Sequence, residues 1–474
     1  MRGLLATSIG VTCAASLALP LTPSATAVTA RPAPTAETAT AAAPATSPAA
    51  PLPGSTQSLP LTPLTRDRAH AGAGAEQGVS RRDVRPFSLL GIVWNDPDAE
   101  LHGRVQVRTR DAKTRAWSGW QDVETHNADH GADPDAAERT SGRVRGATAP
   151  LWVGDSDGVE LRVRSATGHR TEDTARGVRT AASTAPLPTG LSLELVDPGT
   201  VAPAPAPATR ALTTRATAPG TAAAAEASAA NAGLSLVPSG ATEIPALNRE
   251  ATERDLLAHP GAPLSPAQRA AKPYIGPRPS IVTRRGWGAD ESLRESGFRY
   301  TTTVKAAFVH HTASGNNYTC AQAPSVIRGI YRYHVKSLGW RDIGYNFLVD
   351  KCGTLYEGRA GGVTKAVMGA HTLGFNSNSM GVAAIGTYTS VKPSAATVKA
   401  IASLTAWKLG LFGGNPNGKT YLKSGGGNLY AKGKNVRLNV ISGHRDGFAT
   451  ECPGRQLYGK LGSARTTAAR YQGR

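Results

Sequence analysis

The 474-residue sequence lacks an uninterrupted apolar run of about 18 residues, so we expect no membrane-spanning helix. Aromatic residues make up only 5% of the chain, while Ala, Thr and Pro dominate two long stretches, which indicates linker sequence rather than hydrophobic core. No histidine is followed by glutamate, which excludes the His-Glu-x-x-His helix of common zinc proteases.

Acidic residues are scarce in the C-terminal part of the chain. Residues 276–474 contain 27 Lys+Arg and 8 Asp+Glu, a net charge of +19, whereas residues 1–275 contain 26 of each. This asymmetry predicts that the C-terminal part is attracted to a polyanion. The lack of any basic helix or zinc-finger pattern argues against nucleic acid as that polyanion.

The first 27 residues have the features of a secretory signal peptide. Arg2 precedes an apolar, Ala-rich run over residues 4–19, and Ala25-Thr26-Ala27 matches a signal-peptidase site. Cleavage there starts the mature chain near Val28, so we expect a secreted protein. A buried amphipathic helix is the alternative, but the segment has no apolar stripe.

Cleavage would also remove Cys13 and leave three cysteines, Cys320, Cys352 and Cys452. In an exported chain, an odd cysteine pairs between molecules, stays a free thiol or ligates a metal. A Cys320–Cys352 disulfide would leave Cys452 for a metal. A Cys352–Cys452 pair would instead free Cys320 and destroy such a site.

Composition divides the mature chain into four segments. We expect a disordered Ala/Pro/Thr-rich segment over 28–84, a β domain over 85–198, a second Ala/Pro/Thr-rich linker over 199–275 and a globular domain over 276–474. In the β domain, residues 104–108 and 160–164 alternate strictly between polar and apolar, which is typical of half-buried strands. The pattern predicts an antiparallel, sandwich-like all-β domain without a catalytic set.

The C-terminal domain alternates short apolar runs with helical spacing, which predicts a mixed α/β fold. Ser394 should cap a helix that ends at Gly410. We expect strands at 304–309, 345–349, 354–356, 381–388 and 439–441, and helices over 326–335 and 394–409.

Three residues of this domain could ligate a metal. His310 and His444 follow predicted strands, and Cys452 lies eight residues after His444. Imidazole and thiolate are ligands that zinc prefers, and catalytic zinc sites keep three protein ligands and one open position. His311 neighbours His310 in the strand and must point to the opposite face, so only one of the two can reach a metal.

Six motifs then occur in order: Arg284-Arg285-Gly286-Trp287-Gly288-Ala289, Val309-His310-His311-Thr312, Asp342-Ile343-Gly344-Tyr345-Asn346-Phe347, Tyr356-Glu357-Gly358-Arg359, Gly369-Ala370-His371-Thr372 and Gly443-His444-Arg445-Asp446. With them, residues 280–460 resemble the peptidoglycan recognition protein family, which shares its fold with type 2 N-acetylmuramoyl-L-alanine amidases. The N-terminal β domain lies outside this resemblance.

The resemblance implies a Zn²⁺ site formed by His310, His444 and Cys452. Family members that only bind peptidoglycan typically lack the cysteine, so its presence implies an amidase that cleaves between N-acetylmuramic acid and L-alanine. Tyr345 and Thr450 would stabilise negative charge on the carbonyl oxygen.

The resemblance also implies that His371 and Asn376 contact substrate. A structural hydrogen-bonding role for His371 remains open, as does simple core packing for Tyr345.

Three other functions remain to be separated from an amidase: a non-catalytic peptidoglycan-binding protein, a zinc endopeptidase acting on stem peptides, and a nucleic-acid-binding protein. The +19 charge is better explained by anionic wall polymers than by nucleic acid. We therefore expect a cell-wall-associated, monomeric enzyme whose partners are peptidoglycan and these polymers. His126, Asp129 and His130 are read as turn residues of the β domain.

Overall fold

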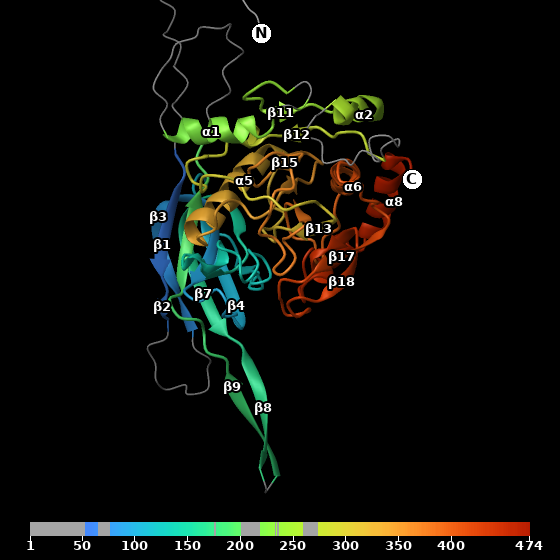
Figure 1. Ribbon diagram of the computed structural model, residues 1–474. Helices are drawn as coiled ribbons and strands as arrows, with labels where there is room; N and C mark the ends of the chain where they lie inside the picture. The colour runs from blue at the N-terminus through green and yellow to red at the C-terminus, as the bar shows by residue number, and fades with distance from the viewer. Residues whose placement is uncertain are drawn as a thin grey trace, which may run out of the picture. The chain divides into compact units, whose positions relative to one another are not determined.

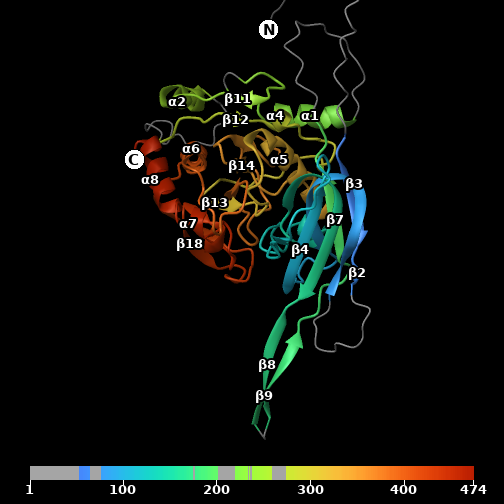
Figure 2. The ribbon, with the colours of Figure 1, turned by 180° about the vertical axis from the view of Figure 1, so that it is seen from behind.

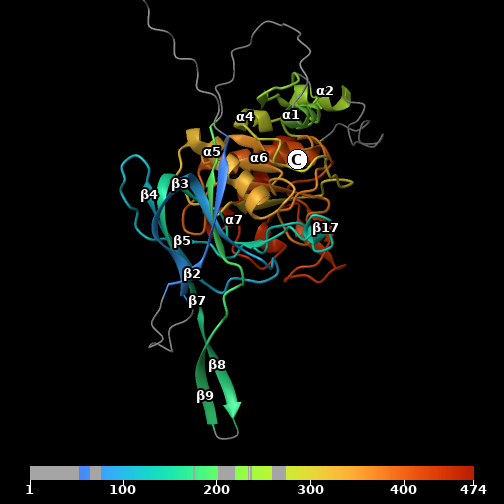
Figure 3. The same ribbon diagram turned by 90° about the vertical axis from the view of Figure 1, so that its left-hand side faces the viewer.

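The strands of the N-terminal domain form one eight-stranded sheet, in the order β1-β10-β3-β7-β4-β5, with β2 and β6 added along β3 (Figure 1). Its pairings are antiparallel. Strands β8 and β9 form a separate hairpin that projects from the end of β7 (Figure 3). The bounds are β1 (Ser55–Pro60), β2 (Thr62–Pro63), β3 (Glu76–Trp94), β4 (Gly103–Asp111), β5 (Gln121–Val123), η1 (Arg139–Ser141), β6 (Gly146–Ala147), β7 (Leu151–Ser165), β8 (Thr167–Thr174), β9 (Gly177–Thr184) and β10 (Ser192–Asp197).

This computed structural model describes residues 53–64, 76–174, 177–200, 219–232, 234, 237–258 and 274–474, all within one compact unit. The signal peptide expected over 1–27 lies outside these residues. Within the described ranges, every helix is too short or too polar to cross a membrane.

The sheet follows the alternation of its sequence. Val105 pairs with Val163, and Val107 pairs with Leu161, across β4 and β7. All four side chains are buried in one hydrophobic cluster, whereas Arg104 and Arg164, which flank them in the two strands, are exposed. Apolar residues at every second position therefore form the core face.

The β domain begins earlier than the expected boundary at residue 85. Strand β1 and the first residues of β3 lie inside the segment 28–84, which the composition predicted to be disordered. Strand β1 extends the sheet by pairing along β10, from Ser55 opposite Asp197 to Pro60 opposite Ser192. Main-chain pairing at a sheet edge depends little on side chains, so composition did not reveal it.

The C-terminal domain contains a seven-stranded mixed sheet in the order β11-β12-β15-β14-β16-β13-β19, with β13 central in the domain (Figures 1 and 2). Strands β13, β16 and β19 run parallel, as do β14 and β16, while β14 and β15 form the predicted antiparallel pair. The bounds are β11 (Glu243–Ile244), β12 (Ile281–Val282), β13 (Ala306–His311), β14 (Phe347–Val349), β15 (Leu355–Glu357), β16 (Ser379–Ala384), β17 (Lys419–Lys423), β18 (Asn435–Asn439) and β19 (Ile441–Gly443).

Helices cover both faces of this sheet. Phe347 and Val349 of β14 belong to the cluster that includes α6, whereas Leu348 between them belongs to the cluster that includes α5. Ser394 caps α6 by accepting a hydrogen bond from the Thr397 backbone, as predicted. The bounds are α1 (Pro219–Ala229), α2 (Arg249–Ala258), α4 (Arg284–Trp287), η2 (Cys320–Gln322), α5 (Ala323–Arg332), η3 (Tyr333–Ser337), α6 (Ala395–Gly410), η4 (His444–Asp446), α7 (Arg455–Tyr458) and α8 (Leu461–Gln472).

The segment 199–275 is not only a linker. It contributes α1, β11 and α2, and β11 pairs with β12 at the edge of the C-terminal sheet. Asn231 is buried and donates to both oxygens of Glu357, at 3.0 Å each. Ala-rich composition is therefore compatible here with packed structure over 219–258.

The β domain and the C-terminal domain share a hydrophobic cluster. Leu89 and Val93 of β3 pack with Ile327 and Ile330 of α5. Tyr333 donates its hydroxyl to the Thr148 carbonyl at 3.1 Å. This shared core joins the two domains.

Candidate metal centre

Two of the predicted ligands lie side by side at the end of the neighbouring parallel strands β13 and β19. Val309 of β13 pairs with Gly443 of β19, so the next residues, His310 and His444, emerge at the same sheet edge. Their Nδ1 atoms are 3.1 Å apart. The Cys452 Sγ lies 3.8 Å from the His310 Nδ1. All three side chains are buried.

His311 points to the other face, as strand geometry requires. Its Nδ1 accepts a hydrogen bond from the Tyr388 backbone at 3.2 Å, and burial lowers the pKa of His311 to about 4. The structure therefore places His310, and not His311, beside His444.

A fourth residue, His130 of the β domain, completes the cluster. The candidate ligand atoms of His130, His310, His444 and Cys452 lie within 4.8 Å of one another. The His130 Nε2 is 4.0 Å from the Cys452 Sγ, and its ring packs edge-on against His444 with centroids 4.7 Å apart. Sequence analysis had assigned His130 to a turn.

Asp129 connects two of these histidines. Its Oδ1 lies 3.0 Å from the His130 Nδ1, and its Oδ2 lies 3.6 Å from the His444 Nδ1. The Thr450 side chain also hydrogen-bonds this carboxylate. Burial alone would raise the pKa of Asp129, but the two histidines and Thr450 outweigh burial and hold it well below its ordinary value.

The electrostatics of the cluster suit a metal cation. Burial lowers the pKa of His444 to about 3 and that of His310 well below its ordinary value, so both imidazoles keep free lone pairs. Burial raises the pKa of the Cys452 thiol. A metal ion would reverse this by binding the thiolate.

The spacing also fits a metal. In a tetrahedral site with zinc–ligand bonds of about 2.0–2.3 Å, ligand atoms are about 3.3–3.6 Å apart. The observed separations of 3.1, 3.8 and 4.0 Å bracket this range. Among the described residues, the buried Oδ2 of Asp129 and Nε2 of His444 have no hydrogen-bond partner. The residues present can therefore hold a metal ion.

The two predicted catalytic residues border the cluster. The Tyr345 ring lies 5.6 Å from His310 and 5.8 Å from His130 between centroids. Burial raises the pKa of Tyr345 well above its ordinary value, so its phenol stays protonated. The Thr450 hydroxyl accepts from the Cys452 backbone at 3.2 Å. Their catalytic roles remain predictions.

The predicted substrate-binding residues, His371 and Asn376, lie beside the β-domain segment that contains Gly131. The His371 Nδ1 is 3.2 Å from the His310 Nε2. Asn376 accepts from the His371 backbone at 2.7 Å and donates to the Gly131 carbonyl at 2.8 Å. Both side chains are buried, and the side chain of Asn376 is hydrogen-bonded to the segment around Gly131.

Cys320 and Cys352 form a disulfide with Cα atoms 6.2 Å apart, and Cys452 is free. This is the pairing that leaves the thiol of Cys452 for the cluster. The alternative pairing of Cys352 with Cys452 is therefore not the one in the structure.

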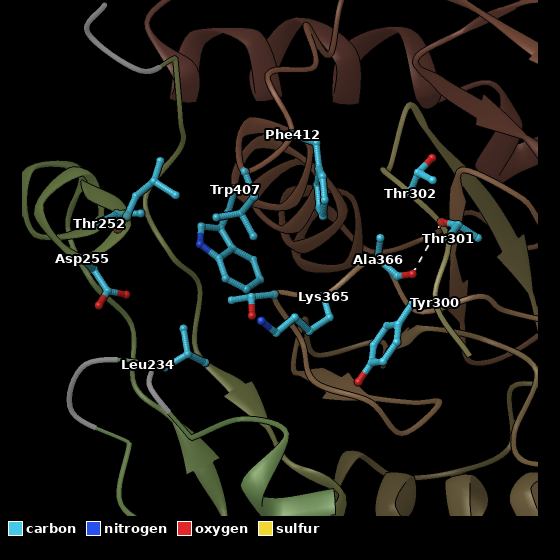
Figure 4. Close-up of a pocket in the computed structure, with 13 residues that line it drawn as sticks. Leu234, Thr252, Asp255, Tyr300, Thr301, Thr302, Lys365, Ala366, Trp407 and Phe412 are labelled. Atoms are coloured by element: carbon cyan, nitrogen blue, oxygen red, sulfur yellow. Dashed lines mark hydrogen bonds between the residues drawn. The ribbon is translucent and has the colours of Figure 1, made fainter. Parts of the chain in front are cut away.

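Two cavities of similar size differ in their relation to the cluster. One, of about 410 Å³, is lined by Asp129 and Thr450 together with Glu100, Phe448 and Glu451, and so borders the metal site. The other, of about 400 Å³, is lined by Tyr300, Trp407 and Phe412 (Figure 4). None of the four cluster residues lines either cavity, but the second cavity also lacks their neighbours Asp129 and Thr450, so we do not connect it with metal chemistry.

His130 escaped sequence analysis because it belongs to a different domain from the other ligands. The one available signal was the dipeptide Asp129-His130, in which a carboxylate precedes an imidazole. Local spacing could not show that it meets residues more than 170 positions away.

Comparison with known proteins assigns the two domains separately. A family described as N-acetylmuramoyl-L-alanine amidase matches residues 300–455. A second, described as Rv3811 N-terminal galactose-binding domain-like, matches residues 34–188. The metal cluster therefore combines residues from both matched regions.

Individual relatives match about two fifths of this chain. Peptidoglycan-recognition protein SC2 of Drosophila simulans is 30% identical over 182 residues, covering 38% of this chain and 84% of that protein. Peptidoglycan-recognition protein SC1a of Drosophila melanogaster is 30% identical over 190 residues, covering 40% and 87%. A solved structure of peptidoglycan recognition protein-LE with tracheal cytotoxin, a monomeric diaminopimelic acid-type peptidoglycan, is 29% identical with a TM-score of 0.30, covering 39% and 92%.

Proposed function

The chain belongs to the family of peptidoglycan-recognition proteins and type 2 amidases, and from this premise we propose that it is a secreted, zinc-dependent N-acetylmuramoyl-L-alanine amidase. Its N-terminal domain is galactose-binding-domain-like, and its C-terminal domain has the mixed sheet of the amidase fold. The family is one of peptidoglycan recognition or hydrolysis. The proposal selects hydrolysis of the amide between N-acetylmuramic acid and L-alanine.

One observation carries the proposal: the ligand atoms of His310, His444 and Cys452 converge at one sheet edge. Their chemistry, two imidazoles and one thiolate, is that of a zinc site. The presence of Cys452 favours hydrolysis over binding alone, because a recognition protein without catalysis has no need of a third metal ligand.

Zinc, when bound, would polarise the amide carbonyl and lower the pKa of a water molecule. The protonated phenol of Tyr345 would donate a hydrogen bond to the carbonyl oxygen as negative charge develops there. Thr450 would be a weaker donor, because its hydroxyl also bonds Asp129 and the Cys452 backbone.

Charge and family support the proposed substrate and location. The C-terminal half has a net charge of +19, which would hold the enzyme on anionic wall polymers. We propose that it acts as a monomer outside the cell, at the cell wall. A non-catalytic peptidoglycan-binding protein is the alternative, since members of this family are named for recognition.

Mass spectrometry of digested peptidoglycan separates these functions. An amidase releases intact stem peptides with a new L-alanine amino terminus and leaves glycan strands with free lactyl carboxylates. An endopeptidase cuts within the stem, and a binding protein releases nothing. Products cut within the stem, or none from any metal-loaded form of the enzyme, would refute the proposal.

A further inference from the structure

A zinc hydrolase needs an open position at its metal, but this cluster presents four protein ligands. Three histidines and one cysteine form a closed tetrahedral set, which is typical of structural zinc sites. The additional ligand is His130, and it comes from the β domain. The hydrogen bonds of His130 and of the segment that carries it show how this side chain is held beside the other ligands.

The hydrogen bonding of His130 is that of a metal ligand. Asp129 Oδ1 lies 3.0 Å from its Nδ1, so this nitrogen carries the proton and donates it to the carboxylate. The lone pair of Nε2 then faces the cluster. Metal-binding histidines are commonly oriented by a carboxylate in this way.

The segment that carries His130 is fastened to the C-terminal domain on both sides. Before it, the Asp129 carbonyl accepts from the Leu373 backbone at 3.0 Å. After it, Asp133 Oδ1 accepts from the Gly374 backbone at 2.9 Å and from Asn376 Nδ2 at 2.7 Å.

A buried ion pair adds a further attachment. Arg359 donates to both oxygens of Glu138, at 2.9 Å each, and both side chains are buried. An unpaired charge at either position would be costly in this environment. We name residues 127–138 the capping loop.

The capping loop also covers the groups that a substrate would need. The His130 ring lies edge-on against Tyr345, with centroids 5.8 Å apart at 85°. The side-chain amide of Asn376 is hydrogen-bonded to the loop, and His310 and His444 have no exposed surface. While the loop is docked, the neighbouring cavity reaches Asp129 and Thr450 but is lined by none of the four cluster residues.

We infer that His130 is a fourth protein ligand of the metal and that the capping loop keeps the enzyme latent until the loop withdraws. The latency rests on the proposed function, whereas the ligand assignment does not. Withdrawal would free one coordination position and uncover Tyr345 and Asn376 together.

The test uses the full chain loaded with cobalt(II), whose visible spectrum reports the ligands of a zinc site, and azide as a small probe ligand. Azide should leave the wild-type spectrum unchanged, because no position is open. It should shift the spectrum of His130→Ala, whose zinc affinity should fall by about tenfold or more. His102→Ala, an exposed histidine of the same domain, is the matched control and should behave as wild type.

A second variant keeps the test decisive if His130→Ala does not fold. Asp133→Ala removes a fastening of the capping loop without touching a ligand, and should give a partial azide response. A wild-type spectrum that responds to azide as strongly as either variant would overturn the inference. So would azide-insensitive spectra in every variant that binds cobalt.

Activity then separates this inference from the proposed function. We expect His130→Ala to release stem peptides faster than wild type. An azide-responsive His130→Ala protein that binds zinc and releases no peptide would leave the ligand assignment standing and refute the amidase. A wild-type enzyme that releases stem peptides and already responds to azide would refute the ligand assignment and leave the amidase standing.

Discussion

His130 and Cys452 are separated by 322 positions in the sequence, yet the Nε2 of one lies 4.0 Å from the Sγ of the other. The metal cluster is therefore assembled from two domains. Cys452, His310 and His444 are supplied by the amidase domain, and removal of His130 should weaken the site without abolishing it.

Loss of a ligand from the amidase domain should have a larger effect. Cys452→Ala and His310→Ala should each remove most of the bound zinc, because the remaining set lacks a thiolate or a central imidazole. Metal analysis of the purified full chain should find about one zinc in wild type and in His102→Ala. A full complement of zinc in Cys452→Ala would show that the ligand assignment is wrong.

Tyr345→Phe should separate catalysis from binding. It removes one hydroxyl and keeps the packing of the ring, so zinc content and wall binding should be unchanged. Loss of one donor to the developing oxyanion lowers kcat by about 10²–10³ with little change in KM. Thr450→Val should lose less.

Steady-state hydrolysis should be measured for Tyr345→Phe in both the wild-type and the His130→Ala background, so that latency does not mask the effect. Unchanged turnover in both backgrounds would show that Tyr345 only packs in the core and does not take part in catalysis.

The disulfide should contribute to stability and not to chemistry. Cys320 and Cys352 are 32 positions apart, and closing a loop of that length stabilises the fold by about 3–4 kcal/mol on chain-entropy grounds. A Cys320→Ser, Cys352→Ser double variant should unfold at lower urea concentration and still bind zinc. Loss of zinc with an unchanged unfolding midpoint would contradict this assignment.

Glu357 should make stability depend on pH. Burial raises the pKa of its carboxyl from 4.5 to about 7. Because the folded pKa is the higher one, its stabilisation is fully present below about pH 4.5 and is lost as pH rises through about 7. This rise in the pKa of Glu357 corresponds to at most about 3 kcal/mol of unfolding free energy.

Glu357→Gln stays neutral, so its unfolding free energy relative to wild type should increase between pH 5 and pH 8. Urea unfolding of both proteins at the two pH values measures this difference. A difference that does not change with pH would mean that Glu357 is already ionised in the folded protein at pH 5.

Periodic sequence predicts much of this fold because periodicity reports a buried face. The alternation at 104–108 and 160–164 became β4 and β7, and Ser394 and Gly410 bound α6 as expected. Strand β1 escaped because an edge strand is held by main-chain bonds. Helix α1 was not predicted because its Ala-rich sequence carries no apolar stripe.

The candidate site also contains residues that the sequence predicted and one that it did not. His310 lies in β13 and His444 directly follows the neighbouring strand β19, so topology brings these two together, and Cys452 returns to them from the loop after η4. His130 lies in a segment without periodicity, and hydrogen bonds of Asp129, Asp133 and Glu138 to the C-terminal domain hold it at the cluster. A contact between domains of this kind leaves no local pattern.

The most direct test of the central claim is hydrolysis of purified peptidoglycan in H₂¹⁸O by the zinc-loaded full chain, wild type and His130→Ala. The account predicts that ¹⁸O enters the lactyl carboxylate of the muramic acid and that the released stem peptides begin with an unlabelled L-alanine. The rate should be higher for His130→Ala. Label in a peptide carboxylate, or no label from either protein while zinc is bound, would contradict the account.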